Sequence, residues 1–369
     1  MTEPRTGEPR TGKPTTGEPT TGKTTTGEPT TAEPTTAEPT TDELWHRRVF
    51  HAPRDLVWRC LTEPDELARF WGPRGMSTPA AGIVVELRPG GRFETLMVGE
   101  HGSHRMVATF TEVVAPERLA WREAATGMHT TSTLTDLGDG TTEVVIHQRH
   151  VPAVMRTPEA RAGFATSLDK LAEYLVQSLV APTYGGLADL LETQDWDAPS
   201  LCEKWAVRHV VAHVTMPVRL TPELFGAEMA AAGGDFAVLS NTLAERDGDL
   251  PKATLLAQLR DPALHAWQPP GGGAAGALNH AVIHSLDVTI ALGRPAVAPP
   301  AAVIAVLDQI TATEGTMFGL RLTDVRLDAT GSTWTWGRGR TVAADGGSLV
   351  ALLGGRTLPD GRALPRANR

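Results

Sequence analysis

The spacing of apolar and polar residues divides the chain into two differently patterned halves. Between residues 46 and 148, apolar residues come in short runs, and turn-forming residues such as Pro89-Gly90-Gly91 and Gly138-Asp139-Gly140 separate several of them. Short apolar runs between turns are typical of antiparallel strands. The pattern predicts strands at 46–51, 83–87, 93–98, 106–113, 119–122, 131–135 and 142–148, with short helices at 53–61 and 63–70.

A long helix is predicted to follow this meander from about residue 158. Its apolar residues are spaced by three or four, which places them on one face of a helix: Phe164, Leu168, Leu171, Leu175 and Leu179. Short helices, a meander and one long terminal helix together predict an α+β domain whose antiparallel sheet grips that helix.

From residue 183 the pattern becomes helical. Helices are predicted at 186–192, 205–216, 222–232, 239–244, 252–259, 278–292 and 300–318, with Pro and Gly clustered between them. The last fifty residues are mixed again, with strands at 325–329 and 333–336 and a short helix at 348–353. We expect a helical bundle followed by a small α/β subdomain.

The first 41 residues repeat a Thr-Gly-Glu-Pro-Thr theme with no large apolar side chain after Met1. Such a segment cannot offset the entropy of ordering, so we expect a disordered tail. The predicted organisation is therefore a tail at 1–41, an α+β domain at 42–180, a helical bundle at 181–299 and a small subdomain at 300–369.

Bulk composition narrows the class of function. The formal net charge is −9, and the basic residues form no stripe, which argues against a nucleic-acid partner. Only two cysteines are present, Cys60 and Cys202, too few for a secreted disulfide framework. The sequence shows neither a signal-peptide core nor an apolar stretch of membrane-spanning length, so we expect a soluble cytoplasmic protein and no membrane partner.

Histidines carry the candidate chemistry of the helical half. His209 and His213 form one His-x-x-x-His pair, and His280 and His284 form another. Residues four apart share a helix face, so each pair can present two imidazoles to a common point, as in zinc-binding helices. Asp287 continues the second face and is placed to accept a hydrogen bond from an imidazole. The spacing alone fits histidines on a helix surface or in the core equally well.

Several motifs in the first half occur in the order of one family. They are Phe50-His51-Ala52-Pro53, Phe70-Trp71-Gly72-Pro73, Pro89-Gly90-Gly91, Pro116-Glu117-Arg118-Leu119 and Gly163-Phe164. Residues 44–180 thereby resemble the activators of heat-shock protein 90 ATPase, within the START/SRPBCC superfamily. The resemblance implies a helix-grip fold whose cavity takes a small hydrophobic ligand, with Trp58 and Trp71 as candidate walls. The alternative is that both indoles simply pack in the core.

Motifs in the second half are similar to mycothiol-dependent maleylpyruvate isomerases and their DinB-like relatives. They are Cys202 to Arg208 leading into His213, then His284-Ser285-Leu286-Asp287 with 291–295, then 336–339 and 354–356. The resemblance implies a divalent ion, usually zinc, on His213, on His284 and on an acidic residue four positions before His284. That position is His280 in this chain, so the implied site has three histidines and one open position for water or a thiol. His209 matches no ligand of the family.

These resemblances imply a metal-dependent transferase or isomerase that joins a low-molecular-weight thiol, such as mycothiol, to a small electrophile. Arg356 is the candidate for holding a carboxylate of substrate or cofactor through a bidentate contact, although a surface arginine near a glycine turn fits its sequence context equally well. The rival hypothesis is a non-enzymatic binding or stress-response protein, in which the ligand cavity and the metal site act as sensors. Regulation of a chaperone through the first domain is a third hypothesis.

Overall fold

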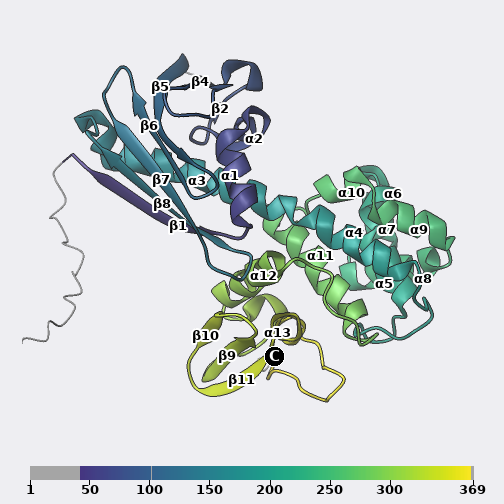
Figure 1. The fold of residues 1–369 in the computed structure, drawn as a ribbon. Coiled ribbons are helices and arrows are strands. Elements are labelled where there is room, and N and C mark those ends of the chain that lie inside the picture. Colours follow the sequence, from purple (N-terminus) through teal and green to yellow (C-terminus); the bar gives the residue numbers. More distant parts are fainter. Residues whose placement is uncertain (1–41, 101, 367–369) are drawn as a thin grey trace, which may run out of the picture. The chain divides into compact units, whose positions relative to one another are not determined.

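The computed structural model describes residues 42–100 and 102–366. Within these residues an antiparallel sheet with flanking helices is followed by a helical region and a small mixed subdomain (Figure 1). The predicted α+β fold class is confirmed. The expected disorder of residues 1–41 falls outside the described residues.

The first domain is built on an antiparallel sheet whose strands follow the order β1-β8-β7-β6-β5-β4-β2, with β3 paired to β4. The strands are β1 (Leu44–Phe50), β2 (Met76–Ser77), β3 (Val84–Val85), β4 (Arg92–Gly99), β5 (Gly102–Val114), β6 (Arg118–Glu123), β7 (His129–Asp136) and β8 (Thr142–Arg149). Successive side chains of β8 point to opposite faces of the sheet. Val144 and Ile146 lie on the face that is buried, whereas Val145 and His147 lie on the other, more exposed face.

Three helices accompany this sheet, namely α1 (Arg54–Thr62), α2 (Pro64–Phe70) and α3 (Pro158–Ser178). The helix α3 begins at Pro158, where Thr157 caps the helix by accepting from the backbone N–H of Ala160. Its predicted apolar stripe is confirmed, because Leu171 and Leu175 lie in the same buried core as residues of the sheet. This is the helix-grip arrangement.

The helical region contains α4 (Val180–Leu191), α5 (Val207–Val214), α6 (Met216–Arg219), α7 (Pro222–Ala231), α8 (Phe236–Gly248), α9 (Lys252–Leu259), α10 (Pro262–Ala266) and α11 (Gly273–Thr289). Helices α4, α5, α9 and α11 contribute to one buried core, as in a four-helix bundle. Helix α8 packs on α5, so residues of α8 can reach the side chains of α5.

The C-terminal subdomain consists of α12 (Pro300–Ala312), β9 (Val325–Thr330), β10 (Thr335–Gly337), β11 (Arg340–Asp345) and α13 (Gly346–Leu353). The strand β11 was not predicted, because its sequence Arg-Thr-Val-Ala-Ala-Asp offers little apolar alternation. It pairs parallel to β9, while β10 pairs antiparallel to β9. The buried residues of α12 and α13 belong to the same core as the bundle.

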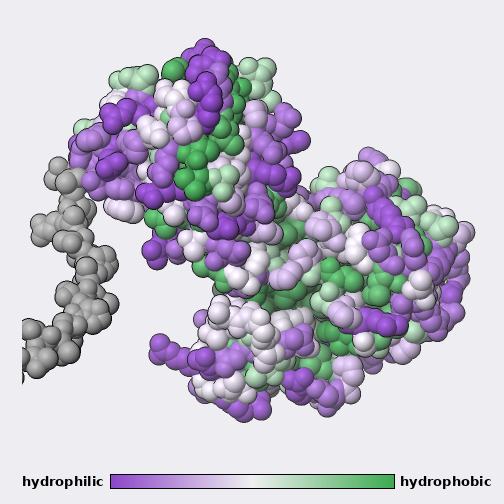
Figure 2. All heavy atoms as spheres, viewed as in Figure 1, coloured by the Kyte–Doolittle hydropathy of each residue, from purple (hydrophilic) through white to green (hydrophobic). Residues whose placement is uncertain are grey.

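Polar residues cover most of the face of the molecule drawn in Figure 2, and apolar residues appear there in smaller areas. Among the described residues, no helix combines the length and apolar character needed to cross a membrane.

Candidate metal centre

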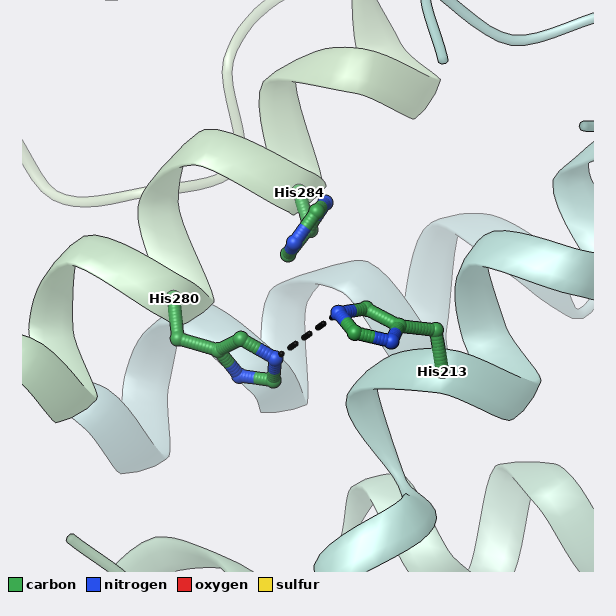
Figure 3. Close-up of side chains that lie close together, drawn as sticks. All are labelled: His213, His280 and His284. Atoms are coloured by element: carbon green, nitrogen blue, oxygen red, sulfur yellow. Dashed lines mark hydrogen bonds between the residues drawn. The ribbon is translucent and has the colours of Figure 1, made fainter. Parts of the chain in front are cut away.

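Helices α5 and α11 bring three histidines to one point. His213 lies in the last turn of α5, and His280 and His284 lie one turn apart on α11. Figure 3 shows the three rings turned toward one another, with the Nε2 atoms of His213 and His280 separated by 3.3 Å. Ring centroids of the three pairs lie 4.8–5.1 Å apart. The two helices therefore cross as a shared three-histidine site requires.

The spacing of these nitrogens fits a single metal ion. Two nitrogens that each lie ~2.0–2.1 Å from a tetrahedral zinc are about 3.3 Å apart. The distance between the Nε2 atoms of His213 and His280 matches this value. One ligand atom from each of the three histidines lies within 4.8 Å of the other two.

In each of the three imidazoles, the Nδ1 atom contacts another side chain of the protein. The Nδ1 atom of His213 lies 3.0 Å from Oγ of Ser240 on α8, and that of His280 lies 2.9 Å from the hydroxyl of Tyr184 on α4. The Nδ1 atom of His284 lies 2.9 Å from Oδ2 of Asp287, one turn further along α11. Three different partners thus leave all three Nε2 atoms facing inward.

The partner of His284 decides which way their hydrogen bond runs. An ionised carboxylate only accepts hydrogen bonds, so Nδ1–H of His284 is the donor and Nε2 is the ring atom left to face a metal. The hydroxyl groups of Ser240 and Tyr184 can accept from Nδ1–H of their imidazoles in the same manner. The arrangement is therefore compatible with the same tautomer in all three rings.

Burial keeps His213 and His280 uncharged in the absence of a metal. Desolvation, helped by His284 nearby, lowers the pKa of His213 to about 3 and lowers that of His280 well below its usual value. Both rings are therefore neutral near pH 7, with lone pairs available to a cation. This is the donor chemistry that zinc prefers.

Asp287 is the centre of a second, connected network. Burial alone would raise the pKa of Asp287, but hydrogen bonds from Arg356 and His284 outweigh burial and hold it far below its ordinary value. Nε and Nη2 of Arg356 donate to the two carboxylate oxygens at 2.7 and 2.9 Å, and Sγ of Cys202 donates at 3.0 Å. Both oxygens of the carboxylate therefore accept hydrogen bonds, and these bonds hold Oδ2 of Asp287 in place beside His284.

This network assigns Arg356 a different partner from the expected one. The sequence led us to expect a bidentate contact with a carboxylate of substrate or cofactor, whereas the bidentate contact in the structure is with Asp287. A role for Arg356 in holding an external carboxylate stays a prediction, and it requires the pair with Asp287 to open or to be shared.

His209 has a local structural role. It is the third residue of α5, and its Nδ1 atom accepts from the backbone N–H of Ala206, which precedes the helix. The metal-competent groups among the described residues do not include His209. That His209 is a neighbour of the site and not a ligand stays a prediction.

Sequence reasoning missed two of the three partners of the histidines. Tyr184 and Ser240 lie 96 and 27 residues from the histidines they contact, and no motif singled them out. Cys202 falls inside a motif but had no expected role, and it lies at Asp287 beside the metal centre. Two half-buried indoles also contact the site, Trp205 beside His213 and Trp267 beside His280.

Trp58 and Trp71 of the first domain lie in or against its core. Trp58 is buried, and the Trp71 ring contacts Phe93 and Trp121 while its Nε1–H donates to Thr95. These contacts are those expected of packing residues. A ligand-facing role for either indole stays a prediction.

Two family models match separate parts of the chain. A family model described as activator of Hsp90 ATPase homolog 1-like protein matches residues 51–176. A second, described as mycothiol maleylpyruvate isomerase N-terminal domain, matches residues 183–268. His213 lies inside the second match, whereas His280 and His284 lie beyond its end.

Solved structures similar to the chain cover a little over a third of it. A protein from Nitrosomonas europaea is 30% identical over 37% of this chain and 96% of its own length, with a TM-score of 0.33. An AHSA1-like protein from Aeromonas hydrophila is 26% identical over 36% of this chain and 91% of its own, with a TM-score of 0.31. An AHSA1 protein from Silicibacter pomeroyi is 20% identical over 36% and 96%, with a TM-score of 0.31. No curated protein matches the chain.

Proposed function

Because the chain joins a domain of the family of activators of Hsp90 ATPase to a mycothiol maleylpyruvate isomerase N-terminal domain, we propose that it is a metal- and thiol-dependent transferase or isomerase acting on a small electrophile. The observation that carries the proposal is the convergence of three imidazole Nε2 atoms whose Nδ1 atoms are all held by protein groups. A site built only to fill a core would not need three partnered imidazoles around one point.

In this proposal His213, His280 and His284 hold a divalent ion, for which we propose zinc. Three protein ligands leave a fourth position open, as in catalytic zinc sites. Zinc bound there would keep the sulfur of a low-molecular-weight thiol, such as mycothiol, in its nucleophilic thiolate form near neutral pH.

The protein groups around the site have positioning roles. Asp287 orients His284, while Tyr184 and Ser240 orient His280 and His213. Arg356 neutralises Asp287, so the carboxylate adds no net charge to the centre. We place the reaction in the cytoplasm, where thiols are kept reduced.

The first domain contributes ligand binding in this proposal. Its helix-grip arrangement of sheet and α3 is suited to a small, mainly hydrophobic molecule. That molecule would be the electrophile itself or a separate effector.

A second candidate function is non-enzymatic small-molecule binding, with the metal centre as a sensing site. Two observations favour it. The position occupied by an acid in the isomerase motif is His280, which removes a proton acceptor. The guanidinium group of Arg356 is already paired with Asp287.

The two candidates are separated by measuring metal content and turnover on the same samples. Elemental analysis should find one equivalent of metal in the wild type, and none in His213→Ala, His280→Ala or His284→Ala. The matched control is His209→Gln, because Gln at this helix position can still accept from the N-cap amide, and it should keep the metal.

The zinc-loaded protein is then assayed with mycothiol, glutathione and cysteine against a cis-enone acid, an epoxide and an alkyl halide. Thiol-dependent consumption of an electrophile, lost in the three alanine variants and kept in His209→Gln, is the expected result. Stoichiometric metal without turnover would favour the sensing protein, and absence of metal from the wild type would contradict both candidates.

A further inference from the structure

A cavity of about 590 Å³ lies where the first domain meets the helical region. Tyr174 and Gln177 of α3 line it, together with Gly273 and Ala275 at the start of α11. Helices α3 and α11 pack against one another, so both domains contribute to its walls. The volume falls within the range of about 300–1,000 Å³ that is typical of small-molecule sites. We call this space the junction cavity.

The junction cavity is distinct from the sites described above. Lys170, Tyr174 and Gln177 are spaced by four and three, which places them on one face of α3. Leu171 and Leu175 belong instead to the buried core that α3 forms with the sheet. The residues that line the junction cavity include neither the metal-centre histidines nor the side chains that contact their Nδ1 atoms. A ligand here would therefore lie between the two domains and not inside either of them.

Two cations line the junction cavity without an acidic partner. Arg69 lies in the last turn of α2 and is exposed, while Nζ of Lys170 donates to the backbone oxygens of Gly72 and Met76 at 3.0 and 3.1 Å. Within residues 42–100 and 102–366, neither of these two cationic side chains forms a salt bridge. Burial and the nearby Arg74 lower the pKa of Lys170, which is the direction expected for a cation that lacks a carboxylate neighbour.

A smaller cavity beside the first shows the ordinary arrangement of charges. It has a volume of about 260 Å³ and shares Glu173 with the junction cavity. Its two cations, Arg48 and Arg74, form salt bridges with Asp169 and Glu173. Glu173, the acidic residue in the lining of the junction cavity, is thus already neutralised by Arg74. The positive charge of the junction cavity is therefore not balanced by its own walls.

The polar side chains around the junction cavity are ordered by bonds to the protein. Nε2 of Gln268 donates to Oε1 of Gln177 at 2.9 Å, and Nε2 of Gln177 donates to the backbone oxygen of His265 at 2.6 Å. The hydroxyl of Tyr174 donates to Glu66, a carboxylate that does not line the cavity. Ordered walls reduce the entropic cost of binding a ligand. Two cations against this one neighbouring acid make the charge favourable for an anion.

We propose that the junction cavity binds a small organic dianion whose carboxylate or phosphate oxygens pair with Arg69 and Lys170. Such a ligand would contact α2 and α3 of the first domain and the start of α11, and it would thereby stabilise the contact between the two domains. This inference goes beyond the proposed function, and it depends neither on the metal nor on turnover.

The test measures binding to the full-length protein by calorimetry, with succinate, succinamide and inorganic phosphate as probes. Succinamide has nearly the shape of succinate but carries no charge. We expect succinate to bind at least about tenfold more tightly than succinamide, because only the dianion balances the two cations. The affinity for succinate should fall as sodium chloride is added, since these cations are partly exposed. Tighter binding of phosphate than of succinate would assign a phosphorylated ligand, and the reverse order would assign a dicarboxylate.

A matched pair of variants at Ala275 tests the location. Ala275 is exposed, lines the junction cavity and lies in the first turn of α11, where an acidic side chain is compatible with the helix. Ala275→Glu should weaken succinate binding by at least about tenfold through repulsion between like charges. Ala275→Gln introduces a side chain of the same size without charge and should bind succinate at least about tenfold more tightly than Ala275→Glu does.

A second pair of variants tests the role of Arg69. Arg69→Gln should weaken succinate binding by about fivefold, the upper end of what an exposed ion pair contributes. The control is Arg59→Gln, because Arg59 is also exposed and also lies in the last turn of its helix, α1, but does not line the junction cavity. Arg59→Gln should leave the affinity for succinate unchanged.

The remaining outcomes separate this inference from the proposed function. Binding of succinate should persist in His213→Ala, and its loss there would show that the anion is a metal ligand and overturn the inference. Equal binding of succinate and succinamide would also overturn it, as would equal succinate affinity in Ala275→Glu and Ala275→Gln. If neither succinate nor phosphate binds saturably, the inference fails while the metal centre and its proposed reaction are unaffected.

Discussion

The substitution Asp287→Asn tests the network that supports the metal centre. The Asp287 side chain is 1% exposed, and its two oxygens accept from Arg356, His284 and Cys202. Asparagine keeps the shape, removes the negative charge and presents an N–H₂ group to at least one of these donors. The change therefore perturbs charge and hydrogen bonding without creating a cavity.

Two effects of known size are expected. Removing one partner of a buried ion pair destabilises a protein by about 3–5 kcal/mol, because the remaining charge is left without compensation. The Arg356 side chain is 25% exposed and can recover part of its hydration, so we expect a loss near 3 kcal/mol. Loss of the acceptor at Nδ1 of His284 should weaken zinc binding by about 10- to 100-fold.

The assay combines unfolding of the metal-free protein by denaturant with zinc titration against a competing chelator. In a double-mutant cycle, Arg356→Met removes the uncompensated charge. The double variant should therefore be more stable than Asp287→Asn alone, while its zinc affinity stays low. His209→Gln serves as the control for both measurements. Wild-type stability and wild-type zinc affinity in Asp287→Asn would refute the reasoning.

Four further changes have expected outcomes. Tyr184→Phe removes the partner of His280 and should lower zinc affinity by about tenfold in the chelator titration. Ser240→Ala should act similarly through His213, and an unchanged affinity in both variants would show that the imidazoles need no orientation. His280→Glu should retain one equivalent of zinc by elemental analysis, because a carboxylate is also a zinc ligand. Deletion of residues 1–41 should leave the melting temperature nearly unchanged, and a large decrease would show that this segment contacts the folded part.

Local patterns in the sequence were sufficient to predict the elements that hold the centre. The pair His280 and His284 lies on one helix as the four-residue spacing predicts. The same spacing could not choose between His209 and His213, since both lie on α5. The choice depends on where the helix begins. Because α5 begins at Val207, His209 falls in its first turn and turns back to an unsatisfied amide, while His213 in the last turn faces α11.

Contacts between distant segments were not predictable in this way. Ser240 and Tyr184 reach the histidines because α8 and α4 pack against α5 and α11, and periodicity shows which face of a helix is buried but not its neighbour. The case of Arg356 is similar. A bidentate carboxylate contact was expected from its chemistry, but the identity of the carboxylate depends on how the loop after α13 meets α11. Short strands such as β2 also escaped prediction, since two residues carry no period.

The three-histidine composition has an electrostatic consequence for the proposed function. A site with two histidines and a carboxylate would carry one negative charge before a metal binds, whereas three neutral imidazoles carry none. Asp287 lies outside the ligand set, and its charge is balanced by Arg356 at 2.7 Å. A divalent ion on His213, His280 and His284 would therefore keep its full double charge. It would attract an anionic sulfur more strongly than the same ion bound by two histidines and a carboxylate. The absence of a carboxylate at residue 280 thus favours thiol binding, while it leaves any proton transfer in the reaction to the thiol, the substrate or solvent.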